Sequence, residues 1–249
     1  MTIRESIRSH QNAVKNQSFK EKLAYFWEYF GMKTIVLLAI ASILIYLFVQ
    51  IFTQKKPGNV GVFFGASEGS SSIAFLDEFA RFANLNQENY DVVIRLSPGI
   101  QLDGTITEEV YQTIESFTAM VAASTVDHIA ADEDLFLYFS YLGFTADLRL
   151  YFNEAQISML GESINYIDGD LLRKYQNKEI TIDYNHFPDP QNPENMIDPI
   201  PVGIDLSEAT DAFHNAYAFV GDEAVIGICS TSERILSAVA FIRFALGFV

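Results

Sequence analysis

A glycine- and serine-rich segment, GASEGSSS at residues 65–72, directly follows the apolar run VGVFF at residues 60–64. In a loop between a strand and a helix, free backbone N–H groups and serine hydroxyls can converge on an anion or a polar ligand. The segment lacks the lysine of a Walker A loop, and Glu68 would repel a phosphate. The pattern predicts either a polar-ligand site or a capped turn beside an empty cleft. The candidate ligand residues are Ser67, Gly69, Ser70 and Ser71.

Acidic residues at the start of a predicted helix provide a second candidate. Asp132, Glu133 and Asp134 complement the positive end of a helix dipole. Such a helix start would reject an anionic ligand and could attract a cationic one, although simple capping by Asp132 explains the same residues. Asp168 and Asp170 resemble part of a calcium loop, but their spacing does not fit D-x-[DN]-x-[DN]-G, so we expect a turn and no metal site.

The remaining residues with reactive side chains do not form a recognisable catalytic pattern. Cys229 lies in an apolar run, where a thiol is usually inert packing, and His128, His186 and His214 lack the spacing of metal ligands. A G-x-S-x-G segment is also missing. We therefore expect a protein that is not an enzyme and needs no cofactor. Tyr184 could line the rim of a cleft or belong to a solvated loop.

The elements that would position these residues alternate along the chain. Apolar strands are predicted at residues 60–64, 91–96 and 126–131, with amphipathic helices between them, which favours a parallel sheet covered by helices. The strands of the second half are shorter and interrupted by a loop rich in proline and asparagine. Ser230 and Glu233 have the spacing of a capping box before a terminal helix.

The charge distribution separates the chain into two parts near Pro57. Residues 1–56 hold eight bases and three acids, a net charge of +5, whereas residues 57–249 hold eight bases and 29 acids, a net charge of −21. The acidic part argues against nucleic acid and anionic lipid as its partners. The single cysteine excludes an intramolecular disulfide.

Residues 34–52 carry no charge and are long enough to cross a bilayer as a helix. An A-x-A-like cleavage site is missing after them, which favours an uncleaved signal anchor. Four lysines lie in the segment before the span, whereas only Lys55 and Lys56 follow it before Arg81, so we expect the N-terminus in the cytoplasm and the C-terminal part outside the cell. The basic segment 1–33 includes an interfacial helix with aromatic residues, and a linker covers residues 53–59. The expected anchor residues are Trp27, Lys33, Ile35, Leu44, Phe52 and Lys55.

Three segments carry a resemblance to a known family: FTAMVAASTVDHIAADEDLFLYFSYLGFTADL, PVGIDLSEA and AVIGICSTSERILSAVAFIRFAL. Together they resemble periplasmic-binding-protein-like class II domains, in the small single-span form found on Gram-positive surfaces. One departure is Ser124-Thr125, where such domains usually have a glycine before the aspartate of the strand. The resemblance implies a two-lobed α/β domain over residues 60–249 with a reduced second lobe. Lobe 1 would span residues 60–133 and 225–249, and lobe 2 residues 134–224.

The resemblance also implies a function. We expect a membrane-anchored extracellular domain that captures a small polar or peptidic ligand between its two lobes. The alternative is an interaction module that has lost its ligand and serves a membrane protein assembly. The absence of a lipobox cysteine favours this alternative, because ordinary uptake receptors are commonly tethered by a lipid on cysteine.

Overall fold

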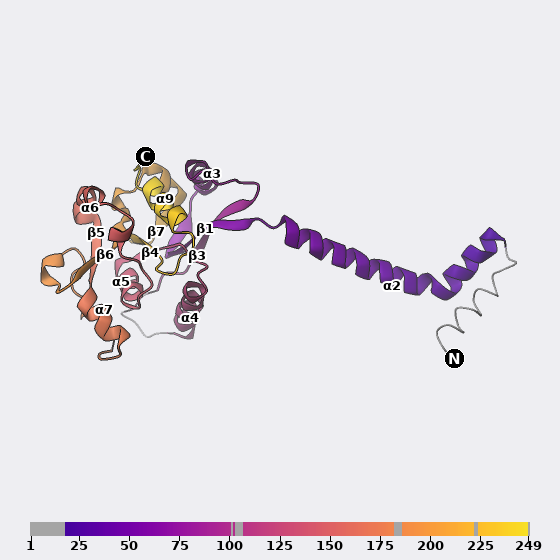
Figure 1. Ribbon diagram of the computed structural model, residues 1–249, viewed down its shortest axis with the longest axis horizontal. Coiled ribbons are helices and arrows are strands. Elements are labelled where there is room, and N and C mark those ends of the chain that lie inside the picture. Colours follow the sequence, from indigo (N-terminus) through magenta and orange to yellow (C-terminus); the bar gives the residue numbers. More distant parts are fainter. Residues whose placement is uncertain (1–17, 101, 103–106, 182–185, 222–223, 249) are drawn as a thin grey trace. The chain divides into compact units, whose positions relative to one another are not determined.

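The computed structural model describes residues 18–100, 102, 107–181, 186–221 and 224–248. The chain divides into two compact units, one ending at Gln54 and the other spanning Lys55–Val249. Figure 1 shows a long helix in the first unit and a mixture of helices and strands in the second. An α/β domain preceded by one apolar helix was predicted, and this coarse architecture is confirmed.

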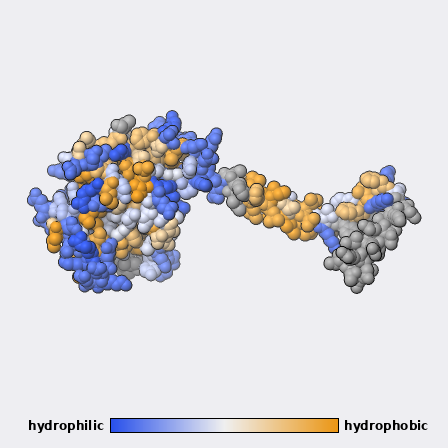
Figure 2. Space-filling model, viewed as in Figure 1, coloured by the Kyte–Doolittle hydropathy of each residue, from blue (hydrophilic) through white to orange (hydrophobic). Residues whose placement is uncertain are grey.

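The first unit is dominated by α2 (Phe19–Thr53). Ser18 and Glu21 form a capping box, in which each side chain accepts a hydrogen bond from the other residue's backbone N–H. Within α2, Gly31–Gln50 is long and apolar enough to cross a membrane. Its apolar side chains cover the helix surface in Figure 2. The predicted anchor residues Trp27, Lys33, Ile35 and Leu44 have exposed side chains, whereas the side chain of Phe52 lies outside the described structure.

The second unit is built on one six-stranded sheet, in the order β3-β1-β4-β8-β6-β5. β1 lies between β3 and β4 and is parallel to both, whereas β8 is antiparallel to its neighbours β4 and β6, and β5 is antiparallel to β6. These strands are β1 (Lys56–Phe64), β3 (Tyr90–Ser97), β4 (His128–Asp132), β5 (Ile164–Asp168), β6 (Pro199–Asp205) and β8 (Ala224–Ile228).

Helices cover both faces of this sheet. One face packs against α3 (Ser72–Phe82), α6 (Glu154–Leu160), α8 (Asp211–Ala216) and α9 (Ile235–Ala245). The other packs against α4 (Glu108–Ala122), α5 (Glu133–Tyr141) and α7 (Gly169–Gln176). Successive strand residues point to opposite faces, so Phe63 joins the first core and Phe64 the second. The unit is therefore a three-layer sandwich with two hydrophobic cores.

Two sequence-based expectations differ from this fold. β1 begins at Lys56, so the predicted linker 53–59 is too long; Lys56 and Pro57 already pair with Tyr90 and Asp91. The arrangement in two lobes is not confirmed, because β5 and β6, expected in the second lobe, extend the same sheet as β1 and β4. A separate two-stranded ribbon pairs β2 (Ala66–Glu68) with β7 (Tyr217–Phe219).

Candidate functional site

The predicted ligand loop lies where open α/β sheets bind ligands. Helix α3, which follows β1, packs on one face of the sheet, and helix α4, which follows β3, packs on the other. From β1 the chain continues to β3 on one side, and from β3 it crosses to β4 on the other side of β1. This arrangement creates a topological switch point outside the carboxyl ends of β1 and β4, where a crevice is expected. The loop after Phe64 and the carboxylate of Asp132, at the end of β4, both lie at this edge.

The loop itself is closed by the β2–β7 ribbon. The β2 residues Ala66, Ser67 and Glu68 pair with β7, and the Ser67 hydroxyl donates a hydrogen bond of 3.2 Å to the Ala218 carbonyl. The Gly69 N–H donates to the Ala216 carbonyl at 2.8 Å. A Cβ atom on Gly69 would collide with the backbone carbonyl of Asn215. The groups of Ser67 and Gly69 that were predicted to hold a ligand therefore bond to the protein itself.

The other predicted ligand residues are placed differently. Ser70 is exposed, and Ser71 precedes α3 without a side-chain capping bond. Asp132 caps α5 by accepting a hydrogen bond of 3.0 Å from the Leu135 N–H, so its capping role is confirmed. Burial raises the pKa of Asp132, and the nearby Asp134 adds to this effect against the opposing Leu135 N–H. Tyr184 lies outside the described residues.

At the opposite end of β4 lies a buried polar cluster that the sequence analysis did not predict. Asp127 is completely buried and accepts hydrogen bonds from the Val60 N–H at 2.7 Å, the Ser232 hydroxyl at 2.6 Å and the Arg234 guanidinium at 2.9 Å. Arg234 also donates to the Thr125 carbonyl at 3.1 Å. These hydrogen bonds connect the segment before α9 to β1 and to the residue that precedes β4, so the cluster stabilises the fold.

His128, the next residue, is also completely buried. Its Nε2 lies 2.8 Å from Asn59 Oδ1, while Asn59 Nδ2 donates to the Ser237 hydroxyl at 3.1 Å. Its ring stacks on Phe241 at a centroid distance of 4.1 Å. Burial lowers the pKa of His128 from 6.5 to about 3, so the imidazole is neutral at physiological pH. A neutral ring that donates from Nε2 leaves an unprotonated Nδ1, which is buried without a hydrogen-bond partner.

The single cysteine is inaccessible. Cys229 is completely buried, and its backbone N–H donates to the Asp127 carbonyl at 2.8 Å. Burial raises the pKa of the Cys229 thiol, and the negative charge of Asp127 adds to the effect. The thiol is therefore protonated and surrounded by protein, which is unsuitable for a nucleophile.

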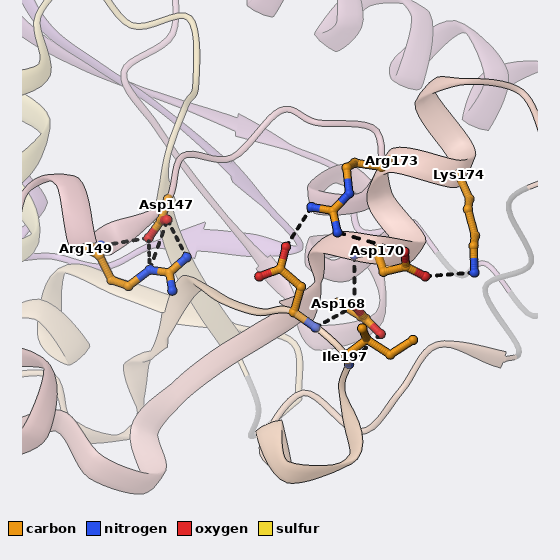
Figure 3. A network of polar contacts seen from close by, with 8 residues as sticks. Asp147, Arg149, Asp168, Asp170, Arg173, Lys174 and Ile197 are labelled. Atoms are coloured by element: carbon orange, nitrogen blue, oxygen red, sulfur yellow. Dashed lines mark hydrogen bonds and ion pairs between the residues drawn. The ribbon is translucent and has the colours of Figure 1, made fainter.

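The aspartates once considered for calcium instead stabilise a turn (Figure 3). Asp168 accepts hydrogen bonds from the backbone N–H groups of Asp170, Ile197 and Asp198 at 2.9–3.1 Å. Burial would raise the pKa of Asp168, but the backbone N–H groups, that of Ile197 foremost, outweigh burial and hold the pKa below its usual range. Asp170 pairs with Lys174 at 2.7 Å. Within the described part of the chain, no group of three or more acidic, histidine or cysteine side chains could hold a metal ion.

Among the surface grooves of the described residues, three are well defined, and none of these three is lined by the predicted ligand residues. A groove of about 480 Å³ lies beside the start of α9 and is lined mainly by apolar groups, including Tyr90, Leu236 and Ala240. A second, of about 370 Å³, runs between β3 and α4 and contains Arg95. The third, of about 270 Å³, lies beside α8 and β7.

Comparisons with known proteins give no relative for this chain: no family model, no curated protein and no solved structure matches it.

Proposed function

We propose that the chain is a non-catalytic interaction module, tethered to a membrane by α2, whose acidic α/β unit docks a protein partner. The observation that carries the proposal is the free edge of the sheet. β3 pairs only with β1 among the described strands, so one side of an eight-residue strand is left without a strand partner. An uncovered strand edge presents backbone N–H and C=O groups that another chain can bind.

The interior groups support a role without catalysis. Cys229 and His128, the best candidates for a nucleophile and a base, are both completely buried. Asp127 bonds to three donors and holds the fold together.

The orientation of the anchor is part of this proposal. Bases dominate the sequence before the span, whereas residues 57–249 carry a net charge of −21. The bias of basic residues favours a cytoplasmic N-terminus and an extracellular α/β unit. Since Cys229 is buried, a cysteine introduced at exposed Ser70 should react with a membrane-impermeant thiol reagent on intact cells. A cysteine at exposed Lys20 should react only after lysis, and the opposite pattern would reverse the orientation.

A second candidate function is capture of a small polar or peptidic ligand, as class II binding proteins do. The groove between β3 and α4 favours it, because Arg95, Ser97 and Gln112 line its walls and could hold a carboxylate. Such a ligand would bind to this groove and not at the switch point, where Ser67 and Gly69 are already bonded.

Two measurements on the full chain in mild detergent separate the candidates. For the interaction module, native mass spectrometry of protein extracted from its own membranes should show an assembly heavier than one chain. A melting-shift screen with amino acids, short peptides and sugars should then show no specific stabilisation. Ligand capture predicts a single-chain mass and one ligand class whose stabilisation grows as RT ln(1 + [L]/Kd). That result would overturn the interaction proposal.

A further inference from the structure

The free edge of β3 has a defined pattern of available backbone groups. The Ser97 carbonyl accepts a hydrogen bond from the Gly65 N–H, so Ser97 directs its backbone toward β1. In a parallel pair, every second residue of a strand directs its backbone N–H and C=O groups toward the same neighbour. Arg95, Val93 and Asp91 therefore also direct their backbone groups toward β1. The backbone groups of Val92, Ile94 and Leu96 therefore point outward from the sheet.

Two opposite charges lie four residues apart on this edge strand. Asp91 and Arg95 occupy alternate positions on the face covered by α4, since Arg95 pairs with Val62, which packs in the α4 core. Within the described structure, neither side chain forms an ion pair, and the Arg95 guanidinium donates a hydrogen bond of 3.1 Å to the sulfur of Met120. Four other bases of the unit, Arg149, Arg173, Lys174 and Arg234, pair with carboxylates, whereas Arg81, Lys178 and Arg243 form no ion pair within the described residues.

We propose that β3 pairs with β3 of a second copy of this chain, in an antiparallel register centred on Val93. This inference rests on the proposed interaction function and identifies the partner. A twofold axis places the same surface of both copies in contact, and two identical strands related by such an axis must run antiparallel. The two sheets then join into one.

The centred register satisfies both the backbone and the charges. Val92 of one copy faces Ile94 of the other, and their outward N–H and C=O groups form the hydrogen-bonded pairs. Asp91 faces Arg95 of the second copy on both sides of the axis, at a non-hydrogen-bonded position where Cα atoms approach to about 4.5 Å. Tyr90 and Leu96, 42% and 41% exposed, face each other across the two copies and become covered.

Neighbouring registers lack this complementarity. After a shift by one residue, each residue with outward backbone groups faces a residue whose backbone groups point toward β1, so the hydrogen bonds between the copies are lost. A shift by two residues places Arg95 opposite Val93 or Asn89, so both charges lose their partners. Charges on edge strands often prevent edge-to-edge pairing. Asp91 and Arg95 would prevent pairing in the shifted registers and favour the centred one.

Charge reversal tests this register in the full chain, extracted in mild detergent and weighed by native mass spectrometry. Asp91→Arg or Arg95→Asp places like charges opposite each other and should weaken dimerisation at least tenfold. The double variant D91R/R95D restores opposite charges and should restore the dimer. Reversal of the exposed Arg81 on α3, by Arg81→Asp, is the matched control and should leave the dimer unchanged. Unchanged melting temperatures would show that the variants are folded.

Disulfide cross-linking in membranes tests the geometry independently. Val93→Cys faces itself across the axis and should form a dimer under mild oxidation, because non-hydrogen-bonded pairs meet the distance that a disulfide needs. Arg95→Cys should not cross-link with itself but should cross-link with a co-expressed Asp91→Cys chain. Equal cross-linking of Arg95→Cys and Val93→Cys would overturn the register.

The outcomes also separate this inference from the proposed function. A wild-type assembly whose mass does not respond to any of the charge reversals would overturn β3 pairing and leave the interaction module standing. A wild-type chain extracted as a single copy, without other subunits, would overturn both.

Discussion

The carboxylate of Asp127 and the guanidinium of Arg234 meet inside the domain, with 2.9 Å between Oδ2 and Nε. The two residues are 107 positions apart in the sequence. Through the Val60 N–H, the same carboxylate also holds the start of β1. One buried ion pair thus joins the first strand after the membrane helix to the last helix of the chain.

We expect Asp127→Asn to destabilise the α/β unit by about 3 kcal/mol, because removal of one charge leaves the other partly buried and uncompensated. The value is at the lower end for buried pairs because the Arg234 side chain is 24% exposed. Urea unfolding of the full chain in detergent, followed by near-ultraviolet circular dichroism, measures the effect.

The matched control is Asp147→Asn, which removes the ion pair with Arg149. Both side chains are partly exposed, so the expected loss is below about 1 kcal/mol. Similar losses for Asp127→Asn and Asp147→Asn would contradict a special role for the buried pair.

Gly69→Ala should open the β2–β7 ribbon, since the added methyl group would collide with the Asn215 carbonyl. Overpacking of this kind costs about 1–3 kcal/mol. Hydrogen exchange at Ser67 and Ala218 should become faster in the variant, while the neighbouring exposed Ser70→Ala leaves it unchanged. Unaltered exchange in Gly69→Ala would show that the loop can move away from the ribbon.

The sequence predicted the parts of this fold that depend on neighbouring residues. Continuous apolar runs predicted β1, β3 and β4, and the helix cap at Asp132 followed from local spacing. The number of lobes depends instead on which strands pair across the chain. β6 contains Pro199 and Pro201, residues that interrupt strand patterns, yet it joins the main sheet beside β8.

The same limit explains the site. The prediction that Ser67 and Gly69 follow a strand is correct. β7, which pairs with β2, has only three residues, too few to show the alternation of apolar and polar residues that predicts a strand. Ser230 and Glu233 had the spacing of a capping box, whereas α9 begins later, at Ile235. Ser232 and Arg234 in this segment bond to Asp127 instead, a long-range contact that local spacing cannot indicate.

Asp168→Ala should destabilise the backbone conformation at Ile197 and Asp198, directly before β6. Asp168 accepts bonds from the Ile197 and Asp198 N–H groups, and loss of such charge-assisted bonds costs about 1.5–3 kcal/mol. Hydrogen exchange should become faster at Ile197 and Asp198. Asp170→Ala removes only exposed ion pairs with Lys174 and Arg173 and serves as the control. Equal effects of both variants would assign the stabilisation to the ion pairs.

The buried His128 should make the α/β unit less stable in acid. Its pKa is about 3 in the folded protein, below the ordinary value of 6.5, because burial disfavours the charged ring. Between these two values the unfolded chain binds a proton that the folded chain excludes. The free energy of unfolding should therefore fall as the pH falls below about 6.5, by up to about 1.4 kcal/mol per pH unit from this group.

The glutamine in His128→Gln does not titrate. Between about pH 4 and 6, unfolding of this variant should take up one proton fewer than unfolding of the wild type, so its unfolding free energy should change less steeply with pH, whatever its absolute stability. An unchanged slope in His128→Gln would mean that the ring gains its proton while the domain is still folded.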